Sequence, residues 1–276
     1  MIIDTIRAEI FKLMHNRWTL FWAFMAAPAA TLVFGIVLEV LFVSPGSALS
    51  SVRGTALVQY LLDGCAIGSN LLAQLLLIMG AATIFAGEYQ WQTWRAIVPR
   101  SSRGALMVAK FVAFGVFAVG TILGCTLAEL IISILSSLVT RTPINWPQIA
   151  RAEALTAMGV VGLASLIEAL LIAAMVAVGA VLMRSVLASA LTAFFALVGL
   201  ELIASRIPPN EQLPIDVVLP GFAASSVSAW ADAMLGNSGS PKAEWGALGL
   251  PALGVEFLLF ALVSLALFLR QDLSRE

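Results

Sequence analysis

The chain has 276 residues, of which 61% are apolar and 11% charged, and its mean hydropathy is +0.99. Soluble domains carry about 25% charged residues because a folded surface must be hydrated. This composition therefore excludes a soluble globule and predicts an all-α, polytopic membrane protein. The net charge of −1 excludes an electrostatic basis for nucleic-acid binding. A single histidine and two distant cysteines match no metal-ligand pattern, so no metal site is expected.

Six stretches are long and apolar enough to cross the ~30 Å hydrocarbon core of a bilayer as helices. They cover residues 18–43, 64–86, 105–138, 155–183, 186–204 and 245–269. We expect a single membrane domain over residues 1–276, with a cytoplasmic loop at 87–104 and an outer loop at 205–244. The outer loop combines several prolines with an apolar middle, which predicts short re-entrant helices supported by surrounding protein.

The basic residues predict the orientation of these spans. Six crossings place both termini on one side, and ten of the fifteen Lys and Arg residues lie on that side: Arg7, Lys12, Arg17, Arg95, Arg100, Arg103, Lys110, Arg184, Arg270 and Arg275. Because basic residues near span ends concentrate on the inner face, we expect both termini in the cytoplasm.

The first seventeen residues have a different pattern. Their apolar side chains follow one helical face and their charged side chains lie outside it, which is typical of a helix lying in the membrane interface. A secretory signal peptide is the competing interpretation. It fits less well because the segment is acidic as well as basic and the apolar run that follows is long enough to span.

The sequence lacks the motifs of the common membrane enzymes. No Lys follows a Gly, so the chain has no phosphate-binding loop of the Walker type, and the single histidine, His15, precedes the first span. We therefore expect no enzyme activity and no cofactor bound by this chain. The spacings Gly64–Gly68 and Gly120–Gly124 indicate close helix packing.

The loop at 87–104 places aromatic residues beside charged ones, with Tyr89 and Trp94 next to Glu88 and Arg95. This mixture suits a protein–protein anchor. It equally suits an interfacial aromatic belt with positive-inside anchoring. The physical pattern alone leaves both interpretations open.

Five segments in chain order carry a resemblance. One is the loop, which contains Gly87-Glu88-Tyr89, Thr93, Arg95 and Pro99-Arg100 and is followed by Ala109-Lys110. The other four segments are Ile6–Leu13 with Arg17-Trp18, Met183–Val186, Leu219-Pro220 with Ala223-Ala224, and Leu269–Leu273. Together they resemble the ABC-2 type permeases, the membrane subunits of ATP-driven bacterial exporters of drugs and bacteriocins. Gln92 replaces a usual Gly, Trp94 replaces a usual aliphatic residue, and Gln271 stands where a second Arg is common. The first two departures bear on which ATPase the loop accepts.

The resemblance implies a mechanism and a set of partners. A second permease copy pairs with this one, as a homodimer or as a heterodimer with a related permease, in the bacterial plasma membrane. Each copy docks a separate ATPase subunit, which carries the ATP and Mg, and the complex confers antibiotic resistance by export. The residues expected to couple to the ATPase are Glu88, Tyr89, Thr93, Arg95 and Arg100. The expected headgroup or loop anchors are Arg103, Lys110 and Arg184.

Five carboxylates fall within the predicted spans: Glu39, Glu129, Glu168, Glu201 and Glu256. Each costs about 2.5–3.5 kcal/mol at mid-bilayer, so each should face a cavity, a partner or the bundle interior. They could form an acidic translocation pathway for a cationic substrate, a proton relay, or ordinary packing and interface contacts. A proton relay would make the protein a proton-coupled secondary transporter, although the chain shows no internal repeat of the kind common in that class. A scaffold without transport activity would leave the buried glutamates unexplained.

Overall fold

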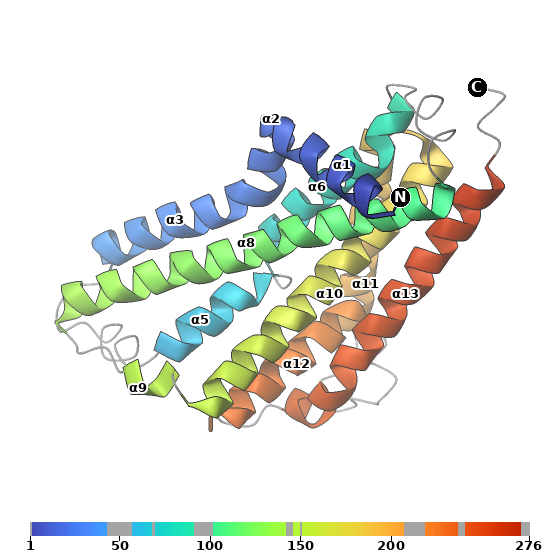
Figure 1. The fold of residues 1–276 in the computed structure, drawn as a ribbon. Coiled ribbons are helices and arrows are strands. Elements are labelled where there is room, and N and C mark those ends of the chain that lie inside the picture. Colours follow the sequence, from blue (N-terminus) through green and yellow to red (C-terminus); the bar gives the residue numbers. More distant parts are fainter. Residues whose placement is uncertain are drawn as a thin grey trace.

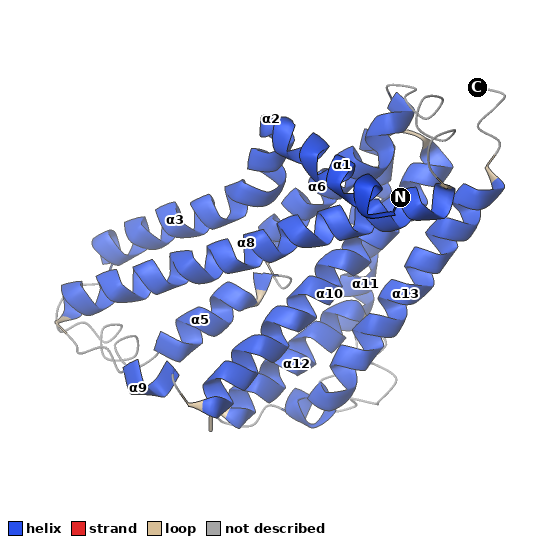
Figure 2. Cartoon of the chain, viewed as in Figure 1, coloured by secondary structure: helices blue, strands red, loops and turns tan. Residues whose placement is uncertain are grey.

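The computed structural model describes residues 2–42, 57–67, 70–90, 102–141, 146–149, 151–206, 219–236 and 241–271, and no strand occurs within these ranges (Figure 2). The helical elements are α1 (Ile2–His15), α2 (Arg17–Leu20), the π-helix η1 (Phe21–Met25), α3 (Ala26–Phe42), α5 (Leu57–Cys65), α6 (Leu71–Gln90), α8 (Arg103–Thr140), α9 (Trp146–Ile149), α10 (Ala152–Met183), α11 (Val186–Ser205), α12 (Pro220–Met234), the 3₁₀ helix η5 (Pro241–Trp245) and α13 (Gly246–Arg270).

Five helices within the described residues are long and apolar enough to cross a membrane: Arg17–Leu41, which joins α2, η1 and α3, and then α6, α8, α10 and the segment Ala243–Arg270. α11 contributes a shorter apolar stretch, Val186–Leu200. Large apolar side chains such as Phe34, Leu127 and Leu262 are exposed on these helices, as expected where lipid is the solvent. The prediction of an all-α, polytopic membrane protein is confirmed.

The second span begins later than the sequence pattern indicates. Gly64 and Cys65 close the separate short helix α5, and α6 starts at Leu71. Asn70 explains this start, because its side-chain oxygen accepts from the backbone N–H of Leu72 (3.0 Å) and of Ala73 (3.3 Å). An Asn at this position satisfies N–H groups that the first helical turn leaves without partners.

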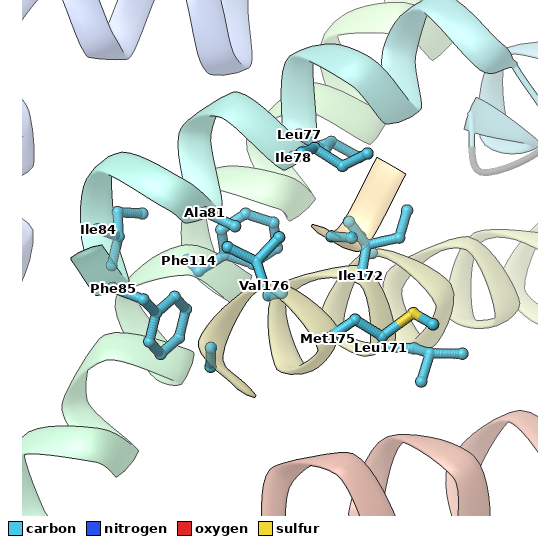
Figure 3. Packing of buried hydrophobic residues seen from close by; sticks show 14 of the residues in the cluster. Leu77, Ile78, Ala81, Ile84, Phe85, Phe114, Leu171, Ile172, Met175 and Val176 are labelled. Atoms are coloured by element: carbon cyan, nitrogen blue, oxygen red, sulfur yellow. The ribbon is translucent and has the colours of Figure 1, made fainter. Parts of the chain in front are cut away.

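The helix α10 lies at the centre of the molecule and packs against α6, α8, α11, α12 and α13 (Figure 1). Its inner face is almost continuously apolar; Leu171, Ile172 and Val176 are fully buried. Figure 3 shows Ile172 and Val176 on the side of α10 that faces Ile78 and Ala81 of α6, whereas Leu171 points away from α6. Burial on nearly all sides is the pattern of a helix enclosed by other helices.

The α12 helix lies in the outer loop predicted at 205–244. It begins at Pro220, whose fixed φ and missing N–H suit the first position of a helix. Its buried face includes Ala223, Val227 and Ala231, and it packs on α13 and α10. Gly249 of α13 permits this close approach, since a Cβ there would lie 2.6 Å from the carbonyl oxygen of Ala223.

Candidate functional site

Four charged side chains meet where α1 crosses the end of α6 and the beginning of α8. This four-charge cluster consists of Glu9, Lys12, Glu88 and Lys110. The Nζ atoms of Lys110 and Lys12 each lie 2.7 Å from an oxygen of Glu88. Glu9 lies 3.5 Å from Lys110 and 3.6 Å from Lys12. The two acids balance the two bases, so the cluster has no net charge.

Lys110 is the most deeply buried member of the cluster, with a side chain only 1% exposed. Its ammonium also donates to the carbonyl oxygen of Ile84 at 2.8 Å. This burial is incompatible with a headgroup contact, so of the two roles predicted for Lys110 only that of a loop anchor stays a prediction. Its position close to the start of a span suggested a headgroup contact, but its side chain points into the bundle, where only matched charges can be accommodated.

The helical spacing of Glu9 and Lys12 places both side chains in the four-charge cluster. Glu9 and Lys12 are three residues apart and share one face of α1. That face turns toward α8, so Glu9 is buried while Ile3 and Met14 are exposed. The apolar stripe of α1 is divided: Leu13 is buried in the core and Ile10 packs against it, whereas Ile3 and Met14 face away from the bundle.

Lys12 is the half-exposed member, with a side chain that is 49% exposed. Burial opposes its positive charge, but the carboxylates of Glu88 and Glu9 outweigh burial and raise the pKa of Lys12 above its usual value of 10.5. α1 therefore stays electrostatically attached to the bundle throughout the physiological pH range.

A second polar group links the same end of α6 to three other helices. Arg103, in the first turn of α8, donates from Nη1 to the carbonyl oxygens of Leu269 (3.0 Å) and Gln271 (2.7 Å). These contacts satisfy carbonyls that the end of α13 leaves without helical partners. Arg103 thus binds protein carbonyls rather than lipid headgroups. Of its two predicted roles, this contact corresponds to that of a loop anchor.

Gln271 connects this contact to α6 and α10. Its side-chain amide lies 2.7 Å from the hydroxyl of Tyr89. When the amide oxygen faces Arg184, it accepts from Nε of that arginine at 2.9 Å while the amide nitrogen donates to Tyr89. Arg184 itself ends α10 in the left-handed conformation, with φ of 53°. The ends of α6, α10 and α13 and the beginning of α8 therefore lie on one side of the molecule, together with α1 (Figure 1).

The predicted coupling residues divide into two groups. Glu88 and Tyr89 lie in the last turn of α6, and each contacts another helix rather than an open surface. Thr93, Arg95 and Arg100 lie outside the described residues. The predicted loop at 87–104 therefore begins at two side chains that connect α6 to α1, α8 and α13.

The sequence pattern does not identify Glu9, Lys12 or Gln271 as parts of this site. Glu9 belongs to the charged face of this segment, and the sequence does not show that this face is buried and needs a basic partner. The choice of Lys110 as that partner depends on how α1 lies across α8, which the sequence of either helix does not reveal.

Residues 5–199 match a family model described as ABC-2 family transporter protein. The chain belongs to the ABC-2 transporter family. The match includes α1 and the end of α6, so it contains the four-charge cluster. As an ABC-2 family member the chain is a membrane permease component of an ABC-type transporter, a class that associates with an ATPase subunit. Among curated proteins, no sequence matches this ABC-2 family chain.

The carboxylates predicted in the spans of this ABC-2 permease have different surroundings. Glu39 is 1% exposed and accepts from the hydroxyl of Tyr60 at 3.2 Å. Glu129 is half-buried on α8, and the side chain of Glu201 lies outside the description. Glu256 is 9% exposed, and neither of its buried oxygens has a hydrogen-bond partner in the described part of the chain.

Glu168 lines a cavity within the bundle. It is 5% exposed, and its Oε1 accepts from Nε2 of Gln74 at 3.4 Å. Both residues line a space of about 460 Å³ between α6, α10, α11 and α12. The described residues thus form a balanced ion-pair cluster at one end of the bundle, and they place the acid Glu168 on the wall of a cavity within it.

Proposed function

We propose that this chain is the permease subunit of an ABC-2 exporter of the bacterial plasma membrane, with α11 as a sixth span and both termini in the cytoplasm. Two copies, or one copy and a related permease, would each dock a separate ATPase subunit that binds ATP and Mg. The chain itself would hydrolyse no ATP. Its substrate would be a drug, peptide or lipid-like molecule moved out of the cytoplasm or inner leaflet, so that resistance follows from export.

The four-charge cluster is the observation that carries this proposal. Segment 87–104 connects α6 to α8 along the chain, and the buried pair of Glu88 and Lys110 joins the same two helices through space. Glu9 and Lys12 add α1 to this unit. A displacement applied at the segment by an ATPase would therefore move the end of α6, the beginning of α8 and α1 together. Such a connection suits the transmission of ATP-driven movement into spanning helices.

α12 supports the proposed topology. Its buried face packs on α10 and α13, so it is integrated into the bundle despite lying in the predicted outer loop. In the proposed orientation it is a re-entrant helix, and its backbone is sheltered by the two spanning helices as such segments require.

The direct test is co-purification of the full chain with a soluble ATPase encoded beside it. We expect a stable complex whose ATP hydrolysis is sensitive to vanadate and stimulated by an exported substrate. Arg95→Ala should release the ATPase while leaving the permease folded in the membrane. Arg151→Ala is the matched control, because Arg151 is exposed at the opposite end of α10 from the cluster.

The assignment of segment 87–104 as the docking site would be contradicted if the Arg95→Ala variant still co-purified with the ATPase and still exported substrate. Transport that requires a proton gradient and no ATPase would contradict the exporter itself. That result would instead favour a proton-coupled secondary transporter using the intramembrane glutamates.

A further inference from the structure

The first span is not one regular helix. It consists of α2, the π-helix η1 and α3, and the chain bends where these elements meet (Figure 1). After η1 the backbone N–H of Ala26 donates to the carbonyl oxygen of Phe21, five residues earlier instead of four. Pro28 follows in the first turn of α3. Prolines and π-helical turns are the usual causes of sharp bends in helices.

Pro28 removes a backbone hydrogen bond from the middle of this bend. It has no N–H, so it cannot donate to the carbonyl oxygen of Phe24, four residues earlier, as a regular helix requires. Phe24 is only 1% exposed. A buried carbonyl without a donor costs free energy, and inside a membrane a neighbouring helix has to supply the donor.

Thr121 of α8 supplies this donor. Its hydroxyl lies 2.9 Å from the carbonyl oxygen of Phe24 and 3.0 Å from that of Phe117 in its own helix. A hydroxyl has one proton, so these two acceptors share it. Thr121 is itself 1% exposed. The bond to Phe24 can therefore lengthen while the hydroxyl keeps an acceptor in α8.

Close packing holds the same part of the first span on two sides. A Cβ on Gly80 of α6 would lie 2.6 Å from Cβ of Ala23. A Cβ on Gly124 of α8 would lie 2.9 Å from Cγ of Pro28. The two glycines thus let α6 and α8 approach the bend closely, and its centre is held between them.

We propose that residues 21–28 form a hinge in the first span and that Thr121 holds the centre of this hinge on α8. Bending there costs less than in a regular helix, because the backbone hydrogen bonds are already interrupted. α1 and α2 change their angle to α3 while Phe24 stays against Thr121. In the proposed exporter, displacement of α1 through the four-charge cluster drives this bending, and that step alone rests on the proposed function.

The first test is a double-mutant cycle between Thr121 and Pro28, measured by thermal denaturation of the full chain in detergent. Thr121→Val keeps the side-chain shape and removes the donor, so it should lower the melting temperature by about 2–4 °C. In the Pro28→Ala background the same substitution should have almost no effect, because position 28 then donates to the carbonyl of Phe24 itself. Equal losses in the two backgrounds would overturn the role of Thr121.

Two matched variants control for general effects on stability. Pro251→Ala removes another proline from inside a spanning helix, at an exposed position of α13, and should leave the effect of Thr121→Val unchanged. Thr192→Val removes a hydroxyl that donates to Ala188 of its own helix, and its effect should be the same with and without Pro28→Ala. Loss of the Thr121→Val effect in the Pro251→Ala background would contradict a specific pairing of Thr121 with Pro28.

The second test measures the bending by double electron–electron resonance between spin labels at Trp18→Cys and Phe34→Cys. These positions are 76% and 65% exposed and lie on either side of the hinge. The buried Cys65 and Cys125 are replaced by alanine in every sample. The full chain is measured in nanodiscs of phosphatidylcholine, and the observable is the width of the distance distribution.

Pro28→Ala should narrow this distribution, because it restores a helical hydrogen bond within the hinge. Thr121→Val should broaden it, and Pro251→Ala should leave it unchanged. A distribution that Pro28→Ala does not narrow would overturn the hinge, even if Thr121→Val did not fold. Both tests use the chain without an ATPase, so their failure leaves the proposed exporter standing, and loss of co-purification leaves the hinge standing.

Discussion

Nζ of Lys110 lies 2.7 Å from Oε2 of Glu88, and the two side chains are 1% and 3% exposed. This ion pair joins the beginning of α8 to the end of α6 across the base of segment 87–104. Removing one partner of a buried pair leaves an uncompensated charge, whereas replacing both partners with apolar residues is often neutral or stabilising. The pair therefore constrains which substitutions the site can tolerate.

Lys110→Met should lower the free energy of unfolding by about 3–5 kcal/mol, because it leaves the acids of the cluster buried with one base. We expect the lower end of this range, since Lys12 still lies 2.7 Å from Glu88. Thermal denaturation of the purified full chain in detergent would measure the change. Lys12→Met should cost about 1 kcal/mol or less, because Lys12 is half-exposed.

The double variant Lys110→Met with Glu88→Leu should recover much of the stability lost in Lys110→Met alone. Contacting residues of this kind show coupling energies of about 0.5–3 kcal/mol in double-mutant cycles. Additive losses in the cycle would show that the pair is not energetically coupled in the membrane protein.

Asp63 on α5 predicts a dependence of stability on pH. Although Asp63 is exposed, partial desolvation by its neighbours raises the pKa of this carboxyl above its usual value of 3.8. Gln59, which donates to it at 3.3 Å, partly offsets this rise, and the charge of Asp232 adds to it. A raised pKa in the folded state means that the folded chain binds the proton more tightly. The protonated carboxyl of Asp63 therefore contributes to the stability of the fold. This contribution is complete below pH 3.8 and is lost as the pH rises through the higher pKa that Asp63 has in the folded chain.

Asp63→Asn should therefore raise the melting temperature at pH 7 and have a smaller effect at acidic pH. The same melting curves, recorded from pH 7 down to pH 3.5, would supply the internal control. A stabilisation of equal size at every pH would argue against ionisation of Asp63 as its cause.

Glu256→Met should increase stability by about 1–3 kcal/mol, since both carboxylate oxygens are buried without a hydrogen-bond partner among the described residues. Met has a similar volume and no polar group to desolvate. Transport should persist in this variant if Glu256 is only a packing residue. A folded Glu256→Met protein that has lost transport would instead place Glu256 in the translocation pathway.

Gly64 and Gly120 both belong to small-residue spacings in the sequence, yet the structure distinguishes them. A Cβ on Gly64 would lie 2.7 Å from the backbone Cα of Thr126, whereas a Cβ on Gly120 meets nothing within 4 Å. Gly64→Ala should thus cost about 1–3 kcal/mol through forced separation of α5 and α8. Gly120→Ala should be neutral or stabilise by up to about 1 kcal/mol. Equal melting temperatures for the two variants would contradict this distinction.

The sequence was sufficient for the features that depend on local composition. Long apolar stretches predicted the spanning helices, because lipid permits only backbone that satisfies its own hydrogen bonds. The amphipathic stripe of residues 2–14 correctly predicted the helix α1. The start of α6 was missed although Asn70 is a recognisable capping residue, since an apolar run by itself carries no information about where a helix begins.

The candidate site could be predicted only in part. Glu88 and Tyr89 were identified through the family resemblance, and the match over residues 5–199 confirms that family. Their partners could not be identified this way, because Glu9, Lys110 and Gln271 belong to helices whose crossing angles depend on packing. Likewise, the sequence placed Glu168 among five equivalent carboxylates, and only the arrangement of α6, α10, α11 and α12 sets it on the wall of a cavity.

By itself the sequence determined that this protein is a bundle of membrane helices preceded by an amphipathic helix. Those properties follow from the balance of apolar and charged residues along each segment, which acts locally. Only the tertiary structure decided which of the few charges pair with one another and that Glu168 lies on the wall of a cavity. Burying a charge depends on the positions of all its neighbours at once, and those neighbours come from helices that are distant in the chain.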